Sequence, residues 1–119
     1  MLLARNVAWP PSMFALVTGF LECDESPASA VLREVKEETG LDAPQATLIG
    51  AYDFPRMNQL ILGYHVPAQG TLALGEELAE VKLIAPERVR PWPMATGLAL
   101  ADWLRARGLP VHFRGPPSP

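Results

Sequence analysis

The acidic residues of this chain are concentrated in one segment, GFLECDESPASAVLREVKEETGL, which places five glutamates within residues 19–41. Glu37 and Glu38 follow Glu34 by three and four residues, so on a helix the three side chains lie on one face. Carboxylates this close repel one another unless a cation lies between them, and oxygen ligands select Mg²⁺, Mn²⁺ or Ca²⁺. Spacing alone leaves two interpretations, a metal site or a solvated charged helix face.

Mg²⁺ suits such a face because it uses one or two protein carboxylates, keeps several waters and takes further ligands from substrate phosphates. Glu34 and Glu38, four residues apart, match this demand if the helix is rigid. Arg33 lies four residues before Glu37 and can pair with it. The loop at residues 19–25 could bring backbone carbonyls, including that of Gly19, near the same ion.

The helix that carries these glutamates is predicted over residues 27–39. Ser26 suits the N-cap, and Pro27 suits the first helical position, where its missing N–H costs nothing. Gly40 suits the left-handed residue that commonly ends a helix. The apolar face recurs at three- and four-residue spacing and consists of Ala28, Val31, Leu32 and Val35.

The rest of the chain alternates strand-like and helical patterns. The predicted strands are residues 1–5, 13–18, 46–54, 59–66 and 80–85. A short helical turn is expected at residues 86–89, and a second helix at 95–107, which Gly108 ends. This order predicts an α/β (α+β) fold, with a mixed β-sheet sandwiched between helices.

Length and composition favour one small domain. The chain has 119 residues, 49% of them hydrophobic, a net charge of −3 and a pI of about 5.3. This charge argues against a general electrostatic hold on nucleic acid or membrane, although it is compatible with a local basic patch. The single cysteine, Cys23, excludes an internal disulfide and a multi-cysteine zinc site. No apolar stretch approaches the roughly 18 residues that span a bilayer. We expect a cytoplasmic protein with one domain at residues 1–113 and a flexible proline-rich tail at 114–119.

The acidic segment resembles the Nudix box of Nudix hydrolases. The fixed positions of that motif are filled by Gly19, Glu25, Arg33, Glu34, Val35, Glu37, Glu38, Gly40 and Leu41. The resemblance implies a Nudix fold and hydrolysis of a diphosphate linked to a nucleoside, with Mg²⁺ or Mn²⁺. It also implies that the chain lacks the strand that usually precedes the one at residues 1–5. Either a second copy covers this edge in a homodimer, which we favour, or the sheet ends there with an exposed strand.

The resemblance assigns a role to each matching residue. Glu34 and Glu38 would be the main metal ligands, with Glu37 as a further ligand or a water-orienting group. Arg33 would pair with the glutamates and orient them. In the same motif Glu25 would support the loop, Gly19 would allow a sharp exit from the preceding strand near the metals, and Gly40 would end the helix.

Family members often recruit one more acid from a loop well after the box. The downstream acidic cluster is residues 76–80, in which Glu77 is the first choice, Glu80 the second and Glu76 the third. A polar loop with capping acids is the alternative interpretation. Phe54, which could stack on a nucleobase, Arg56, which could meet a phosphate, and Glu80 are candidate substrate-binding residues.

Residues 14–40 and 52–60 also resemble the catalytic domain of bacterial NADH diphosphatases, here without the cysteines of their zinc ribbon. The substrates implied are NADH or NAD, ADP-ribose and flavin dinucleotide, each of which would release a mononucleotide. The alternative is a Nudix-fold sensor that binds a nucleotide without hydrolysing it. Such modules usually lose glutamates of the box, which this chain retains.

Overall fold

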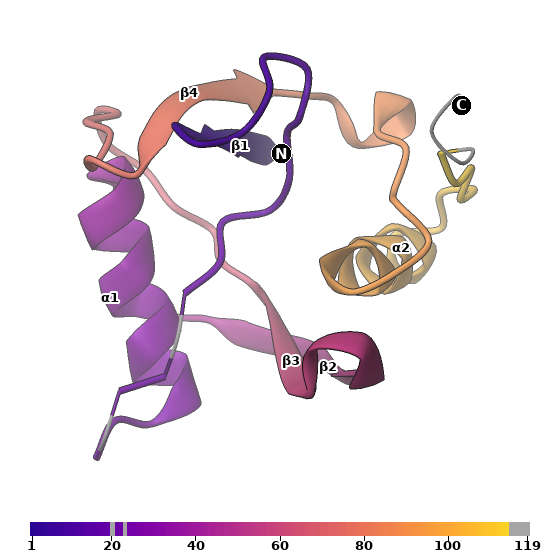
Figure 1. Ribbon diagram of the computed structural model, residues 1–119, viewed down its shortest axis with the longest axis horizontal. Coiled ribbons are helices and arrows are strands. Elements are labelled where there is room, and N and C mark those ends of the chain that lie inside the picture. The colour runs from indigo at the N-terminus through magenta and orange to yellow at the C-terminus, as the bar shows by residue number, and fades with distance from the viewer. Residues whose placement is uncertain (20, 23, 115–119) are drawn as a thin grey trace.

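The computed structural model describes residues 1–19, 21, 22 and 24–114 of the chain. Its helices and strands, in order (Figure 1), are β1 Leu2–Asn6, α1 Pro27–Thr39, β2 Thr47–Phe54, β3 Gln59–His65, β4 Leu78–Leu83 and α2 Thr96–Ala106, with 3₁₀ turns at Pro55–Met57 and Pro86–Arg88. Apart from the turn at Pro55–Met57, for which no range was predicted, each begins and ends within two residues of its predicted range. Cys23 and most of the predicted tail, residues 115–119, lie outside the described residues.

The predicted strand at residues 13–18 is wrong. Only Ala15 pairs with β1, through two backbone hydrogen bonds of 2.8 and 2.9 Å with Ala4. After Ala15 the chain leaves β1 and runs to the N-terminal end of α1 (Figure 1). Phe14 buries its side chain in the core, being 4% exposed, so the apolar character of this segment serves packing rather than strand pairing.

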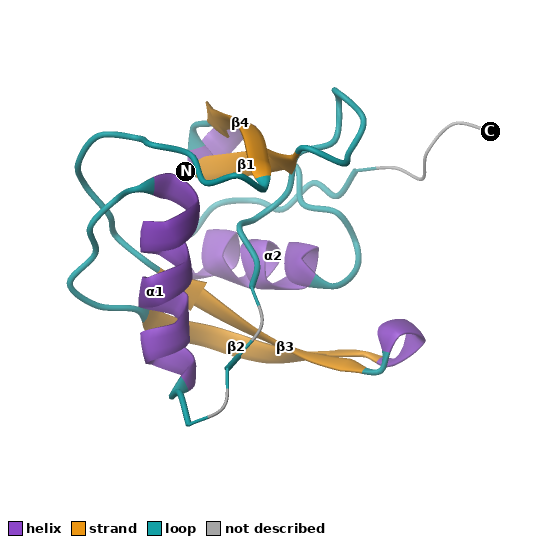
Figure 2. Cartoon of the chain, turned by 60° about the vertical axis from the view of Figure 1, so that its left-hand side comes forward, coloured by secondary structure: helices purple, strands orange, loops and turns teal. Residues whose placement is uncertain are grey.

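The strands form two antiparallel pairs in the described part of the chain. β1 pairs with β4, with Arg5 opposite Glu80, and β2 pairs with β3 as a hairpin. The α/β class is confirmed, but the strands do not join into one mixed sheet, because residues 13–18 contribute a single bridge instead of a strand. Figures 1 and 2 show the two pairs at opposite ends of the molecule, with α1 running alongside from one to the other.

The core lies between β1 and α2. Its buried side chains are Leu3, Phe14, Val89, Leu100 and Leu104. The helix α2 also lies against the β2–β3 hairpin, where the Tyr52 hydroxyl donates a 2.6 Å hydrogen bond to Asp102. A two-stranded hairpin is marginally stable alone, so this cover from α2 helps to hold it. In the described part of the chain, no helix is both long and apolar enough to span a bilayer.

Both ends of α1 are fixed by the predicted residues. The Ser26 hydroxyl accepts a hydrogen bond from the Ser29 N–H at 3.3 Å, which satisfies one free donor of the first turn. Gly40 adopts a left-handed φ of 74° and donates its N–H to the Lys36 carbonyl at 2.9 Å. These caps hold the register of the helix, and therefore the face on which its glutamates lie.

Gly40 offers a direct test of this helix end. A Cβ at Gly40 would lie 2.9 Å from the Cβ of Ala73, and any residue other than glycine is strained at this left-handed φ. Gly40→Ala should therefore destabilise the protein. We expect a loss of about 1–2 kcal/mol from the backbone conformation, and a further loss from the contact.

The matched control is Gly108→Ala, because Gly108 has a φ of 75° and nothing within 4 Å of the added Cβ. Urea unfolding of both variants separates the two costs. If both variants lose the same free energy of unfolding, the contact with Ala73 adds no cost and this part of the prediction is wrong.

Candidate active site

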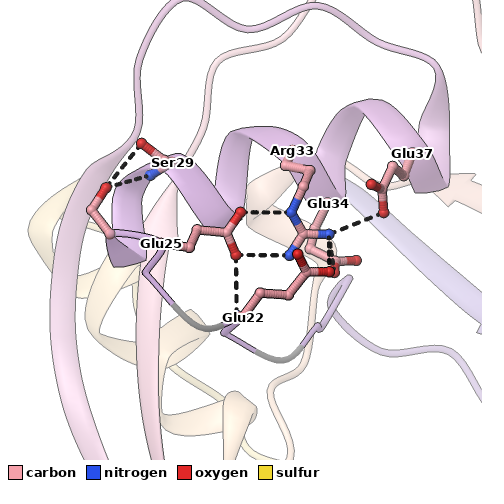
Figure 3. Close-up of polar contacts among 7 residues, drawn as sticks. Glu22, Glu25, Ser29, Arg33, Glu34 and Glu37 are labelled. Carbon is pink, nitrogen blue, oxygen red and sulfur yellow. Dashed lines mark hydrogen bonds and ion pairs between the residues drawn. The ribbon is translucent and has the colours of Figure 1, made fainter.

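The crowded glutamates surround one arginine on α1 (Figure 3). Arg33 donates two parallel hydrogen bonds to Glu25, at 2.6 Å from Nε and 2.9 Å from Nη2. Its Nη1 donates to Glu34 at 3.0 Å and to Glu37 at 3.1 Å, and lies 3.5 Å from Glu22. The predicted contact between Arg33 and Glu37 is therefore present. One guanidinium thus orders four carboxylates from the loop and the helix.

Glu25 links the loop before α1 to the helix itself. Besides its two bonds from Arg33, its carboxylate accepts the backbone N–H of Glu22 at 3.1 Å. The bond from Arg33 lowers the pKa of Glu25, and the same contact raises the pKa of Arg33 further above its ordinary range. The pair is thus ionised at neutral pH and connects the loop to the helix. Glu25 was predicted to support the loop, and this arrangement would allow it to do so.

Gly19 lies directly against the side chain of Glu34. A Cβ at Gly19 would approach the Glu34 carboxyl carbon to 2.4 Å, a distance that no side chain could occupy. The absence of a side chain there makes room for the carboxylate, whose side chain is 19% exposed. The glycine thus permits the chain before the helix to pass close to a candidate metal ligand.

Glu38 is the least satisfied carboxylate of the group. Its Oε2 is buried and has no hydrogen-bond partner among the described residues. Burial raises the pKa of Glu38, and the negative charges of Glu77, Glu34 and Glu37 raise it further. A buried anionic oxygen among like charges is unfavourable without a compensating cation.

The loop after β3 approaches this carboxylate. The Gly75 N–H donates to the Glu38 carbonyl at 3.0 Å, and Glu77, two residues on, is close enough to raise the pKa of Glu38. Glu80, in contrast, lies on β4 and pairs with Arg5 at 2.9 Å. Of these two acids, Glu77 is therefore the one that the structure brings near the α1 carboxylates.

The donors on α1 fit a hard divalent cation. Glu34, Glu37 and Glu38 offer carboxylate oxygens, and an added positive charge would compensate the Glu38 oxygen that lacks a partner in the described part of the chain. Within the described residues, no three acidic, histidine or cysteine side chains converge closely enough to hold an ion alone. Mg²⁺ needs only one or two protein carboxylates, because water and substrate can complete its coordination.

The predicted substrate-binding residues lie apart from this cluster. Phe54 ends β2 and Arg56 belongs to the turn at the hairpin tip, which both views place at the end away from α1 (Figures 1 and 2). A surface pocket at the tip is lined by Asp53, Pro55, Asn58, Gln59 and Leu60. A substrate in contact with both regions would therefore have to extend along the hairpin.

Two residues of the cluster were missed by the sequence analysis. Glu22 adds a fourth carboxylate to Arg33, and its place three residues before Glu25 in the same loop was the available signal. Gly75 anchors the Glu77 loop through its N–H, which sequence spacing does not reveal because the contact joins distant segments.

Comparison with known proteins identifies the family. The model of the NUDIX domain matches residues 1–104, so the chain belongs to the NUDIX domain family. The resemblance to Nudix hydrolases that the acidic segment indicated is therefore confirmed. A protein named NAD-capped RNA hydrolase NudC, from Mycobacterium tuberculosis, is 35% identical over 107 residues, or 87% of this chain and 33% of the relative. The protein of the same name from Pseudomonas aeruginosa is 31% identical over 110 residues, covering 89% of this chain and 40% of the relative. The chain thus spans 33% and 40% of the length of these two relatives.

Solved structures agree on the fold. A NUDIX hydrolase from Nitrosomonas europaea superposes with a TM-score of 0.71 at 23% identity, covering 93% of this chain and 67% of that one. The E. coli ORF135 protein superposes with a TM-score of 0.72 at 26% identity, covering 89% and 80%. The Nudix fold predicted from the sequence is therefore confirmed.

The unpartnered oxygen of Glu38 leads to a stability prediction. In metal-free buffer with EDTA, Glu38→Gln should raise Tm by a few degrees, since the neutral amide removes a buried charge that has no compensating cation. Added Mg²⁺ should raise Tm of the wild type and leave the variant unchanged.

Glu37→Gln is the matched control for that comparison, because Glu37 has a 55% exposed side chain and is already paired with Arg33. It should show no gain in Tm in EDTA. If Glu38→Gln has a lower Tm than Glu37→Gln in EDTA, the charge of Glu38 does not destabilise the metal-free protein and the prediction is wrong.

The link between loop and helix makes a prediction about acid. The folded pKa of Glu25 lies below its ordinary value of 4.5, so its ionised pair with Arg33 stabilises the fold fully above that value. The contribution is lost as pH falls through the lowered folded pKa. The difference in unfolding free energy between wild type and Glu25→Gln, measured in urea, should stay constant down to about pH 4.5 and shrink below it. A difference that is independent of pH would exclude this pair as its source.

Proposed function

We propose that this chain hydrolyses the diphosphate of a nucleoside diphosphate linked to a second group, releasing a mononucleotide. The observation that carries the proposal is the buried Glu38 oxygen, which has no hydrogen-bond partner among the described residues and lies near the carboxylates of Glu34, Glu37 and Glu77. Family membership supports the same reaction class. The chain would act in the cytoplasm on a small nucleotide such as NADH or NAD, ADP-ribose or flavin dinucleotide.

The carboxylates of α1 would hold Mg²⁺ or Mn²⁺. Glu34 and Glu38 are the proposed main ligands, with Glu37 as a further ligand or water-orienting group. When bound, such an ion neutralises diphosphate oxygens and lowers the pKa of a coordinated water. Glu34 would exchange its bond from Arg33 for the ion, while Arg33 keeps its two bonds to Glu25 and holds its place.

Glu77 is the proposed base that accepts a proton from the attacking water. Its support is the loop that Gly75 anchors to the Glu38 carbonyl, which holds the downstream acid beside the α1 cluster. Arg33 acts on the reaction by positioning carboxylates rather than by touching substrate. Glu25 supports it from the loop, and Gly19 leaves room for Glu34.

The relatives favour a dinucleotide substrate. Two of them are named for hydrolysis of NAD-capped RNA, and NAD itself joins two nucleotides through a diphosphate. We therefore place NAD-type molecules first among the candidate substrates, ahead of ADP-ribose and flavin dinucleotide. Phe54 and Arg56 at the hairpin tip are retained as proposed contacts for the part of the substrate distant from the metal.

A homodimer is the proposed assembly. Besides the edge of β1, a second surface supports it, the apolar face of the β2–β3 hairpin, where Leu48, Leu60 and Leu62 are 54%, 67% and 39% exposed. Leu62 lies opposite Ala51 and Leu60 opposite Asp53, so the strand register places them on one face.

A hydrolysis panel tests the function. NADH, NAD, ADP-ribose and flavin dinucleotide would be incubated with Mg²⁺ or Mn²⁺, and products identified by mass spectrometry. We expect one substrate to yield a mononucleotide, and Glu38→Gln to lose about 100-fold or more in kcat/KM. Turnover that is unchanged in Glu38→Gln would exclude the metal assignment, whereas nucleotide binding without any turnover would favour the sensor.

The downstream acid has its own pair of variants. Glu77→Gln should lower kcat by about 100-fold or more if Glu77 is the base. Glu80→Gln should retain activity, because the Glu80 carboxylate is held by Arg5 on the β1–β4 sheet. The opposite ranking would assign the role to Glu80.

A further inference from the structure

The strand β4 has one edge without a neighbour in the described part of the chain. β4 pairs with β1 along its other edge, and β1 in turn meets Ala15 through the bonds of Ala4. No second strand or bridge joins β4 among the described residues. Figures 1 and 2 both show β4 above β1, toward the outside of the molecule. A free strand edge is a template for pairing with another strand.

The bonds between β1 and β4 fix which backbone groups of β4 face outward. Met1 and Ile84 exchange two backbone hydrogen bonds, of 2.7 and 2.8 Å. Opposed residues of an antiparallel pair alternate between bonded and non-bonded positions, so Lys82 also turns its backbone groups toward β1. Val81 and Leu83 therefore turn their N–H and C=O groups away from β1, along the free edge.

The side chains of this edge are also incompletely partnered. Leu83 is 74% exposed, the largest fraction among the large hydrophobic side chains that the structure describes. Lys82 lies 4.2 Å from the centroid of the Phe14 ring and has no carboxylate within 4 Å among the described residues. Glu80 pairs with Arg5 but keeps half of its side chain exposed. A lysine on an edge discourages pairing, unless the incoming strand carries a carboxylate opposite it.

We propose that β4 pairs with β4 of a second copy of this chain, antiparallel and centred on Val81. The strand sequence LAEVKL is complementary to itself in this register. Glu80 of each copy lies opposite the partner's Lys82, and Ala79 lies opposite the partner's Leu83. The interface is therefore two-fold, and it joins the two β1–β4 pairs into one four-stranded antiparallel sheet.

Charge selects this register over its neighbours. The outward groups of Val81 and Leu83 can meet those of a second copy when the pairing is centred on Val81, Lys82 or Leu83. Centring on Lys82 would place two lysines opposite each other, which is unfavourable. Centring on Leu83 would place Lys82 opposite Ile84 and give it no carboxylate. Only the register centred on Val81 gives each charged side chain a partner of opposite sign.

A second copy suits this edge better than an unrelated apolar strand. Such a strand would cover Leu83 and bond the backbone, but it would leave Lys82 without a carboxylate. The inference rests on the proposed homodimer, and it assigns the interface to the free edge of the β1–β4 pair rather than to the β2–β3 hairpin. It does not depend on the proposed hydrolysis, because no part of it involves substrate or metal.

Sedimentation velocity of the full chain over a concentration series tests the proposal. We expect a dimer that dissociates on dilution, because a strand of six residues buries little area. Lys82→Glu should raise the dissociation constant about tenfold or more, because it places two carboxylates opposite each other. Glu80→Lys should do the same with two ammonium groups. An equimolar mixture of the two variants should recover the wild-type affinity, because opposite charges then meet at both positions.

Two control variants separate this interface from others. Arg90→Glu makes the same change of charge as Lys82→Glu at an exposed position outside β4, and should leave the dimer unchanged. Leu60→Asn alters the exposed hairpin face and should also leave it unchanged. The Tm of each variant shows whether it folds. If Glu80→Lys, which loses the bond to Arg5, does not fold, the comparison of Lys82→Glu with Arg90→Glu decides the question.

The outcomes distinguish the interface from the assembly itself. If Lys82→Glu dimerises as tightly as Arg90→Glu, or if the mixture of folded variants does not recover affinity, β4 is not the interface in this register. Loss of the dimer in Leu60→Asn alone would assign it to the hairpin and overturn the proposal, while the homodimer stands. A wild type that stays monomeric at every concentration would overturn both.

Discussion

The guanidinium of Arg33 is the interaction on which the site depends. Four carboxylates from a loop and a helix meet at one side chain, which compensates much of their mutual repulsion. Its two short bonds to Glu25 fix the loop against α1, and its remaining donor orients Glu34 and Glu37. Without this pairing, the acidic face of α1 would be neither compact nor oriented.

That compensation stops short of Glu38. Arg33 pairs with carboxylates of the loop and of the helix positions nearest to it. Glu38 lies near Glu77 instead, and its buried oxygen has no partner in the described structure. The protein thus concentrates its uncompensated negative charge at one end of the cluster. Such a distribution costs stability in the free protein, and the proposed divalent cation would offset that cost.

Local patterns predicted much of the fold and the α1 cluster. Ser26 and Gly40 cap α1 through short-range hydrogen bonds, and its glutamates share a face because helical geometry places them there. The strand predicted at residues 13–18 failed because pairing depends on a distant partner, and Phe14 is apolar for the sake of the core. The sequence also could not decide whether Glu77 or Glu80 lies near the α1 carboxylates. That choice depends on the pairing of Glu80 with Arg5, which only the fold shows.

Direct observation of Mn²⁺ by electron paramagnetic resonance tests the central claim most directly. Wild-type protein and Glu38→Gln would be titrated with Mn²⁺ while the signal of the free ion is followed. The account predicts that the wild type removes Mn²⁺ from solution, and that Glu38→Gln binds it at least about tenfold more weakly. Equal Mn²⁺ affinity in the two proteins would contradict the role assigned to the buried Glu38 carboxylate.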